Sequence, residues 1–152
     1  MVNLVFGEDD PKARKDLMEF IKVEFPSITS LYYTVNTKFN DSLNDQTPIC
    51  YHGNEFVIEQ LGELKFKIGP KSFFQTNSKQ AELLYSITKE FAKLDGSQVV
   101  YDLYCGTGSI GIFVSDLAKK VIGVEVISEA IDDAKENAAL NSINNADFFA
   151  GD

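Results

Sequence analysis

Residues 101–111 read YDLYCGTGSIG, an apolar run typical of a strand, followed by a glycine loop and the beginning of a helix. The three glycines, Gly106, Gly108 and Gly111, have the spacing G-x-G-x-x-G. Such a loop lets the backbone approach a ligand closely and directs amide groups at the helix start toward it. The spacing alone is weak evidence, because several classes of ligand are bound in this way.

The sequence on both sides of this loop alternates between strand-like and helix-like segments. Asn77 and Ser78 can cap a helix with apolar residues on one face, and these are Ala81, Leu84, Tyr85, Ile87, Phe91 and Leu94. After that helix, the pattern predicts strands over 99–104, 121–127 and 147–151, separated by helices over 109–120 and 129–142. This β-α-β-α-β order predicts a parallel sheet with helices on both faces.

The first 76 residues have a different pattern. A strand over 2–6 is followed by a helix that Asp10 and Pro11 begin and Pro26 ends, with an apolar face at Ala13, Leu17, Phe20 and Ile21. Strand-like runs follow at 30–38, 49–53 and on either side of Gly62. We therefore expect a small α+β domain over 1–76 with an antiparallel sheet, and an α/β domain over 77–152.

Composition limits the class of protein. With 152 residues, 44% of them hydrophobic, the chain is long enough to bury a core. No apolar run approaches the roughly 20 residues needed to cross a bilayer, and no signal peptide begins the chain, so we expect a cytoplasmic protein without a membrane partner. Two cysteines and one histidine provide neither a disulfide framework nor a histidine metal site.

Charge is unevenly distributed along the chain. The net charge is −9, and residues 95–152 hold ten acidic and three basic side chains. An acidic chain repels a phosphate backbone, so we expect weak nucleic-acid binding by this chain alone. Residues 64–81 form the one sizeable positive stretch, which contains Lys65, Lys67, Lys71 and Lys79. These lysines could contact RNA, or they could be ordinary solvated side chains, and the sequence favours neither role.

Two carboxylates narrow the choice of ligand. Glu125 ends the second strand of the α/β pattern, where it can accept hydrogen bonds from both hydroxyls of a ribose. Asp102 precedes the glycine loop, where it would repel the pyrophosphate of a nicotinamide cofactor and attract the sulfonium and ammonium groups of S-adenosylmethionine. These residues favour S-adenosylmethionine. An NAD-dependent oxidoreductase remains an alternative, as does an Asp102 that only orders the loop.

Three segments together resemble one enzyme family. They are SFFQTN (72–77), DLYCGTGSIG (102–111) and VIGVEVISEAIDDAKENAALN (121–141). They are similar to the S-adenosylmethionine-dependent RNA (uracil-5-)-methyltransferases. The resemblance implies a Rossmann-like class I methyltransferase sheet, of which residues 77–152 form the first half. It also implies methyl transfer from S-adenosylmethionine to carbon 5 of a uridine in ribosomal or transfer RNA.

The resemblance also implies roles for individual residues. Gln75 would lie beside the cofactor and the target base, Tyr104 and Ser109 would flank the loop around the methionine part, and Glu125 would hold the ribose. Ser109 departs from the asparagine common in the family, which weakens that assignment. The complete set implied to bind the cofactor is Gln75, Tyr104, Gly106, Gly108, Ser109, Glu125 and Asp152.

Neither cysteine suits the family's covalent step, in which a cysteine adds to carbon 6 of uracil and a carboxylate helps to remove the carbon 5 proton. Cys105 follows the cofactor strand directly, and Cys50 lies in the small N-terminal sheet. We therefore expect a central fragment, inactive by itself, with an open sheet edge that allows self-association. The alternative is a non-enzymatic module that binds an adenosine ligand or a protein partner.

Overall fold

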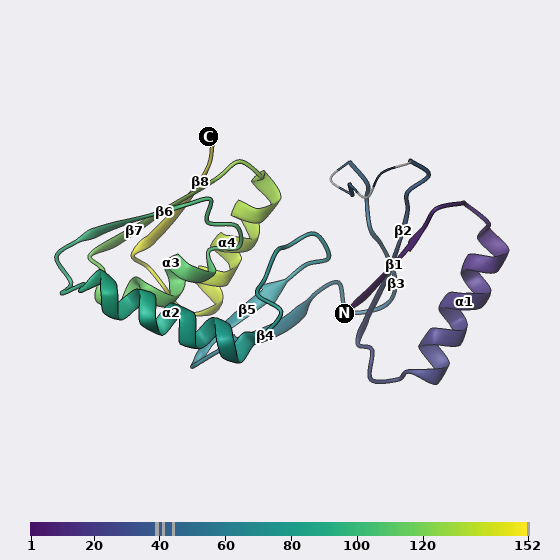
Figure 1. Ribbon diagram of the computed structural model, residues 1–152, viewed down its shortest axis with the longest axis horizontal. Coiled ribbons are helices and arrows are strands. Elements are labelled where there is room, and N and C mark those ends of the chain that lie inside the picture. Colours follow the sequence, from purple (N-terminus) through teal and green to yellow (C-terminus); the bar gives the residue numbers. More distant parts are fainter. Residues whose placement is uncertain (39, 41, 44, 152) are drawn as a thin grey trace. The chain divides into compact units, whose positions relative to one another are not determined.

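The computed structural model describes every residue except 39, 41, 44 and 152. The chain divides into two compact units (Figure 1). The first unit comprises Met1–Val57 with Gly69–Lys71, and the second comprises Ile58–Ile68 with Ser72–Asp152. No helix in the described part of the chain is long and apolar enough to span a bilayer.

A three-stranded sheet and one helix form the N-terminal unit. Its elements are β1 (Val2–Phe6), α1 (Pro11–Glu24), β2 (Ser30–Val35) and β3 (Ile49–Gly53). The strand order is β1-β2-β3, with β1 and β2 parallel and β2 and β3 antiparallel. The expected antiparallel pairing is therefore correct for β2 and β3 but wrong for β1 and β2, because α1 is a crossover that brings β2 back parallel to β1.

Helix α1 begins where the sequence predicts. The Asp10 carboxylate accepts hydrogen bonds from the amides of Lys12 and Ala13, both at 3.0 Å, and Pro11 occupies the first turn. The predicted apolar face is only partly correct, because Met18 is fully buried whereas Leu17 and Phe20 are exposed. Polar side chains of α1 contact two tyrosines of the sheet. The Arg14 guanidinium lies 4.7 Å from the Tyr33 ring centre. Glu19 accepts a 2.7 Å hydrogen bond from the Tyr51 hydroxyl.

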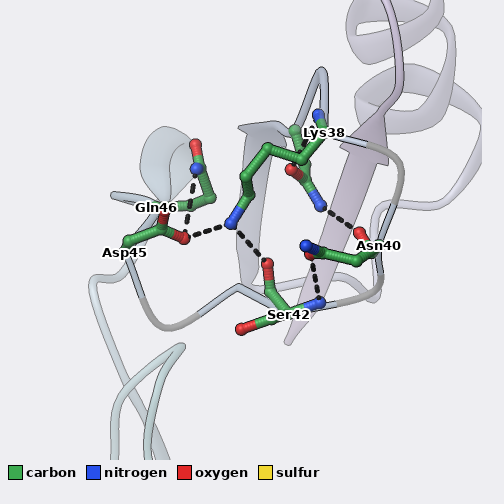
Figure 2. A network of polar contacts seen from close by, with 6 residues as sticks. Lys38, Asn40, Ser42, Asp45 and Gln46 are labelled. Carbon is green, nitrogen blue, oxygen red and sulfur yellow. Dashed lines mark hydrogen bonds and ion pairs between the residues drawn. The ribbon is translucent and has the colours of Figure 1, made fainter.

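A polar network closes the loop between β2 and β3 (Figure 2). The Lys38 ammonium donates to the Ser42 carbonyl at 3.2 Å and forms an ion pair with Asp45. On the same loop, the Asn36 side chain donates to the Asn40 carbonyl at 2.9 Å. Polar bonds therefore hold together a stretch that has few apolar side chains to bury.

The second unit contains a hairpin, three α-helices and a parallel sheet. Its elements are β4 (Val57–Leu61), β5 (Leu64–Ile68), α2 (Ser78–Ala92), β6 (Val99–Leu103), α3 (Ser109–Val114), the 3-10 turn η1 (Ser115–Leu117), β7 (Lys120–Glu125), α4 (Ser128–Leu140) and β8 (Ala146–Ala150). The strand order is β6-β7-β8, and both pairs are parallel. The predicted β-α-β-α-β pattern is thus confirmed.

Helices cover one face of this sheet. Figure 1 shows α2, α3 and α4 on the same side of β6, β7 and β8. Val121 and Phe148 are buried on the covered face, whereas Tyr101 and Leu103 are 65% and 62% exposed. The expected coverage of both faces is therefore wrong for the described chain. Because the strand order advances in one direction, right-handed crossovers place their helices on the same side.

The hairpin β4–β5 belongs to the second unit by its contacts, whereas the sequence places it with the first domain. Two asparagines explain this position, since Asn137 of α4 and Asn141, which caps the C-terminus of α4, accept hydrogen bonds from the amides of Lys67 and Lys65 at 2.7 and 2.8 Å. These bonds join residues that are 70 and 76 positions apart in the sequence. Local patterns do not indicate such long-range partners.

Helix α2 begins at the predicted cap, where the Asn77 side chain accepts a 3.1 Å hydrogen bond from the Gln80 amide. The predicted apolar face is again only partly buried. Ala81 and Tyr85 are buried, whereas Leu84, Ile87 and Phe91 are exposed. The short helix α3, against which α2 packs, covers one part of the α2 surface and leaves the rest open.

Candidate functional site

The glycine loop follows β6 in an unusual backbone conformation. Tyr104, Gly106 and Gly108 have φ values of 60°, 53° and 76°, all in the left-handed region. Glycine adopts this region without strain, but a tyrosine does so rarely and at a cost of order 1 kcal/mol. The Tyr104 side chain is 89% exposed, so its own packing does not impose this conformation. Strain of this kind is concentrated at ligand sites.

Glu125 ties the end of β7 to this loop. Its carboxylate accepts hydrogen bonds from the Gly106 amide at 3.2 Å and from the Ile127 amide at 3.1 Å. Because β6 and β7 are parallel, both strands end at the same edge of the sheet, where α/β proteins bind their ligands. The structure thus brings together two of the predicted site residues, Gly106 and Glu125.

The three glycines of the loop have different roles. A Cβ atom at Gly108 would lie 2.9 Å from the Phe148 ring, and one at Gly111 would lie 2.9 Å from both Asp102 Oδ2 and Val121 Cγ1. These two glycines are required for close packing of the loop and helix α3 on the sheet. Gly106 has nothing within 4 Å of the corresponding position. Open space for a ligand therefore lies above Gly106.

Asp102 orders the beginning of α3. Its Oδ2 atom accepts a 2.8 Å hydrogen bond from the Gly111 amide. Burial raises the pKa of this carboxyl above its usual value, and the hydrogen bond from Gly111 opposes that rise. Of the two roles that the sequence allows for Asp102, the structure shows the ordering one.

Ser109, the first residue of α3, contacts a residue that the sequence did not assign to the site. Its hydroxyl lies 3.1 Å from the Tyr85 hydroxyl of α2. Tyr85 is buried, and its ring lies edge-on to Phe113 at 5.7 Å between centroids. The available signal was a tyrosine on a core face, because a buried phenol needs a hydrogen-bond partner.

The segment SFFQTN is anchored on both sides of an exposed phenylalanine. The Ser72 hydroxyl donates to Asp133 of α4 at 2.5 Å, and the Phe74 ring packs 5.6 Å from that of Phe66. Phe73 between them is 76% exposed. Gln75 is half-buried, and within the described residues no hydrogen bond joins it to the glycine loop. Asp152, the remaining predicted site residue, lies outside the described residues.

The Cys105 thiol is unsuited to nucleophilic chemistry. Burial, together with the nearby negative charges of Asp102 and Glu125, raises its pKa to about 12. Only the thiolate is an effective nucleophile, and at neutral pH almost none is present at such a pKa. This agrees with the expectation that Cys105 does not attack a base.

Two further residues of the loop region were not indicated by the sequence. Thr107 is buried, and its hydroxyl has no hydrogen-bond partner among the described residues. Asn137 of α4 is fully buried and donates a 3.3 Å hydrogen bond to the Thr107 carbonyl. The sequence around Asn137 is acidic and typical of a solvent-exposed helix, so it does not indicate that this side chain is buried.

Comparison with known proteins agrees with this geometry. Residues 94–152 match the family described as a methyltransferase domain. Over its whole length the chain is 53% identical to an uncharacterised RNA methyltransferase of Porphyromonas gingivalis, of which it covers 33%. Over 138 residues, 91% of this chain, it is 54% identical to one from Bacteroides thetaiotaomicron, of which it covers 30%. The chain is similar in sequence to one part of these RNA methyltransferases.

A solved structure shows the same relationship. The crystal structure of Pyrococcus abyssi tRNA (uracil-54, C5)-methyltransferase in complex with S-adenosyl-L-homocysteine superposes with a TM-score of 0.74 and 30% identity. The match covers all of this chain and 36% of the P. abyssi enzyme. The Rossmann-like methyltransferase fold expected from the sequence is confirmed. The chain spans about a third of the length of the curated RNA methyltransferases that it matches.

Proposed function

We propose that this chain forms the cofactor-binding part of an S-adenosylmethionine-dependent RNA methyltransferase that acts on carbon 5 of a uridine. The observation that carries the proposal is the Glu125 carboxylate held beside the open glycine Gly106. Support for the cofactor comes from the P. abyssi relative, whose structure holds S-adenosyl-L-homocysteine. Support for uridine carbon 5 as the target comes from the same relative, which is a tRNA (uracil-54, C5)-methyltransferase.

The residues around the loop fit such a cofactor. The space above Gly106 admits a ligand close to the backbone, and Glu125 supplies acceptors for two ribose hydroxyls. Tyr104 presents an exposed ring at the same loop. When bound, S-adenosylmethionine supplies an electrophilic methyl group. The protein's part is to bind and orient it, with Glu125 and the loop backbone as the main holding groups.

The charge of the site argues against a dinucleotide. Two carboxylates, Asp102 and Glu125, both hydrogen-bond backbone amides at the two ends of the loop. A pyrophosphate needs these amides free and is repelled by neighbouring carboxylates. An amino-acid and ribose ligand does not carry this penalty.

The cofactor assignment is tested by titrating the ¹⁵N-labelled chain separately with S-adenosylhomocysteine and NADH. We expect S-adenosylhomocysteine to shift the backbone amides of Gly106 and Ile127, because both are bonded to Glu125. NADH at the same concentrations should leave them unchanged. Equal or larger shifts with NADH would favour the oxidoreductase alternative.

The methyl transfer is tested in a chimera, in which residues 1–152 replace the matching third of the P. gingivalis relative. We expect the chimera to convert uridine in unmodified ribosomal or transfer RNA to 5-methyluridine, identified by mass spectrometry of the digested nucleosides. A methyl group on another nucleoside would contradict the carbon 5 assignment. A chimera that binds S-adenosylhomocysteine without transferring methyl groups would favour the non-enzymatic alternative.

The 152-residue chain alone should show no methyl transfer. Its Cys105 thiol is protonated at neutral pH, and one of the four lysines of the positive stretch, Lys67, is paired with Glu136 at 2.5 Å. The net charge of −9 also opposes RNA binding. Methylated uridine above background with the chain alone would contradict this part of the proposal.

A further inference from the structure

Helix α4 and its C-terminal cap carry a line of polar side chains on one side, Asp133, Asn137 and the cap residue Asn141, which we call the polar stripe of α4. Their spacing of four residues places them above one another on the helix. Each bonds a different residue of the preceding segment: Asp133 bonds Ser72, Asn137 bonds Lys67 and Asn141 bonds Lys65. The stripe therefore fastens hairpin strand β5 and the SFFQTN segment to α4.

The two asparagines imitate a neighbouring strand. Asn137 accepts from the Lys67 amide at 2.7 Å and donates to the Lys67 carbonyl at 3.3 Å. Asn141 does the same at Lys65, at 2.8 and 2.7 Å. The match is geometric, since four helical residues rise about 6 Å and two strand residues about 6.6 Å. The edge of β5 is thus paired by side-chain amides.

Asn137 has one bond that Asn141 lacks. Its side-chain nitrogen also donates to the Thr107 carbonyl at 3.3 Å, inside the glycine loop. The Thr107 carbonyl and the Gly108 N–H share one planar peptide group, so fixing the carbonyl also fixes the direction of the N–H. Gly108 donates that N–H to the Cys105 carbonyl at 2.9 Å, which closes the loop.

The peptide group before Gly108 needs such a restraint because of the conformational freedom of glycine. Gly108 has a φ of 76°, and glycine occupies both signs of φ with little strain. A peptide group preceding a glycine therefore turns over easily unless a bond holds it. Asn137 is fully buried, so its bond to Thr107 does not compete with water.

We propose that Asn137 is the positioning residue of the cofactor loop: it holds the Thr107–Gly108 peptide in one orientation and couples that orientation to strand β5. Asn141 holds the hairpin without reaching the loop. The inference rests on the proposed function, in which this loop binds S-adenosylmethionine. It links cofactor binding to order in the hairpin through one side chain.

Two variants of Asn137 and one matched control test the proposal on the 152-residue chain. Asn137→Ala removes all three bonds, and Asn137→Asp keeps an acceptor for the Lys67 amide while replacing the nitrogen that donates to Thr107. Asn141→Ala is the control, because it removes both bonds to Lys65 and the 2.8 Å bond that the Asn141 side chain donates to the Asn137 carbonyl, but no bond to the loop. We expect both Asn137 variants to weaken S-adenosylhomocysteine binding about tenfold in NMR titrations, and Asn141→Ala to change it less than about twofold. Equal weakening by Asn141→Ala, or unchanged binding in Asn137→Asp, would overturn the proposal.

The wild-type chain provides a readout that does not depend on how the variants fold. Added S-adenosylhomocysteine should shift the side-chain amide signals of Asn137 and leave those of Asn141 unchanged. A shift of the Gly106 backbone amide without a shift of the Asn137 side chain would contradict the coupling.

Hydrogen exchange separates this proposal from the proposed function, because it needs no cofactor. The Gly108 amide should exchange at least fivefold faster in both Asn137 variants than in the wild type, and at the wild-type rate in Asn141→Ala. If the wild type binds no S-adenosylhomocysteine but this exchange pattern holds, the cofactor assignment fails and the positioning role stands. Wild-type exchange of Gly108 in Asn137→Asp would overturn the positioning role itself.

Discussion

The Glu125 carboxylate and the Gly106 amide are joined by a 3.2 Å hydrogen bond that ties the end of β7 to the loop after β6. The second carboxylate oxygen accepts from the Ile127 amide at 3.1 Å, which fixes the plane of the group. The carboxylate is thus oriented by the backbone before any ligand arrives, which lowers the ordering cost of binding.

Replacement of Glu125 by alanine should weaken S-adenosylhomocysteine binding by about 1–3 kcal/mol, because it removes a charge-assisted acceptor and releases the Gly106 amide. NMR or calorimetric titration of the chain measures the change. Asp132→Ala is the matched control, since it removes the same charge from an exposed position on α4. Unchanged affinity in Glu125→Ala would contradict the assignment of this residue to the ribose.

The Gly106 to Glu125 relationship was predictable from the sequence. Parallel strands of one sheet end at the same edge, so a glycine loop after one strand and an acidic residue at the end of the next must lie close together. The cap residues Asp10 and Asn77 were predictable for a similar reason, since each acts within three residues of its own position. Short-range chemistry is visible in the sequence.

The contacts between residues far apart in the sequence were not predictable. Arg14 on α1 packs on Tyr33, because a tyrosine ring attracts a guanidinium, and the helix pattern around Arg14 does not indicate that partner. Asn137 is buried because Thr107, 30 positions away, and Lys67, 70 positions away, both bond its side chain. Nothing in the helix around Asn137 distinguishes it from a solvated asparagine.

Cys105 should resist thiol reagents at pH 8. Its pKa is raised to about 12, so the folded chain holds it as the unreactive thiol throughout the neutral range. Treatment with iodoacetamide followed by peptide mass spectrometry should show the half-buried Cys50 modified at least tenfold faster than the buried Cys105. In urea both should be modified at similar rates. Comparable rates in the folded chain would contradict the burial and pKa of Cys105.

Asp102→Asn should change how stability depends on pH. Because folding raises the pKa of Asp102, the folded state favours the protonated carboxyl, and this contribution is complete below the unfolded pKa of about 3.9. It is lost as pH rises through the higher folded pKa. Asparagine keeps an acceptor for the Gly111 amide without any charge, so the variant should gain stability relative to the wild type between pH 4 and pH 7.

Urea unfolding at both pH values measures this difference. Asp102→Ala is the control, since it removes the acceptor as well and should be less stable than Asp102→Asn by about 1–3 kcal/mol. A wild type that gains stability relative to Asp102→Asn on raising the pH would contradict the assigned direction of the pKa shift.

The expected self-association through an open sheet edge stays a prediction, and β6 offers one surface on which to test it. Within the described residues β6 and β8 each pair only with β7, so each leaves one edge of unpaired backbone groups, and exposed apolar side chains distinguish the β6 edge. Tyr101 and Leu103 are 65% and 62% exposed on the uncovered face next to that edge, and Phe149 of β8 is exposed on the same face. A second copy of the chain can supply backbone hydrogen bonds to the open edge and an apolar surface that covers these exposed side chains. The net charge of −9 on each copy opposes the association, so it should strengthen as salt is added.

Sedimentation velocity over roughly 5–200 µM, a range spanning the weak affinity expected of a small apolar patch, should show concentration-dependent dimers for the wild type. Leu103→Glu should weaken dimerisation about tenfold or more, because it places like charges on the two facing surfaces. Phe91→Glu is the matched control: Phe91 is 77% exposed on α2, outside the β6 surface, and the same substitution there should leave the dimerisation constant within about twofold of the wild type. Equal effects of the two substitutions would indicate general hydrophobic association. A wild type that stays monomeric at high salt would show that the β6 edge does not pair with a second copy.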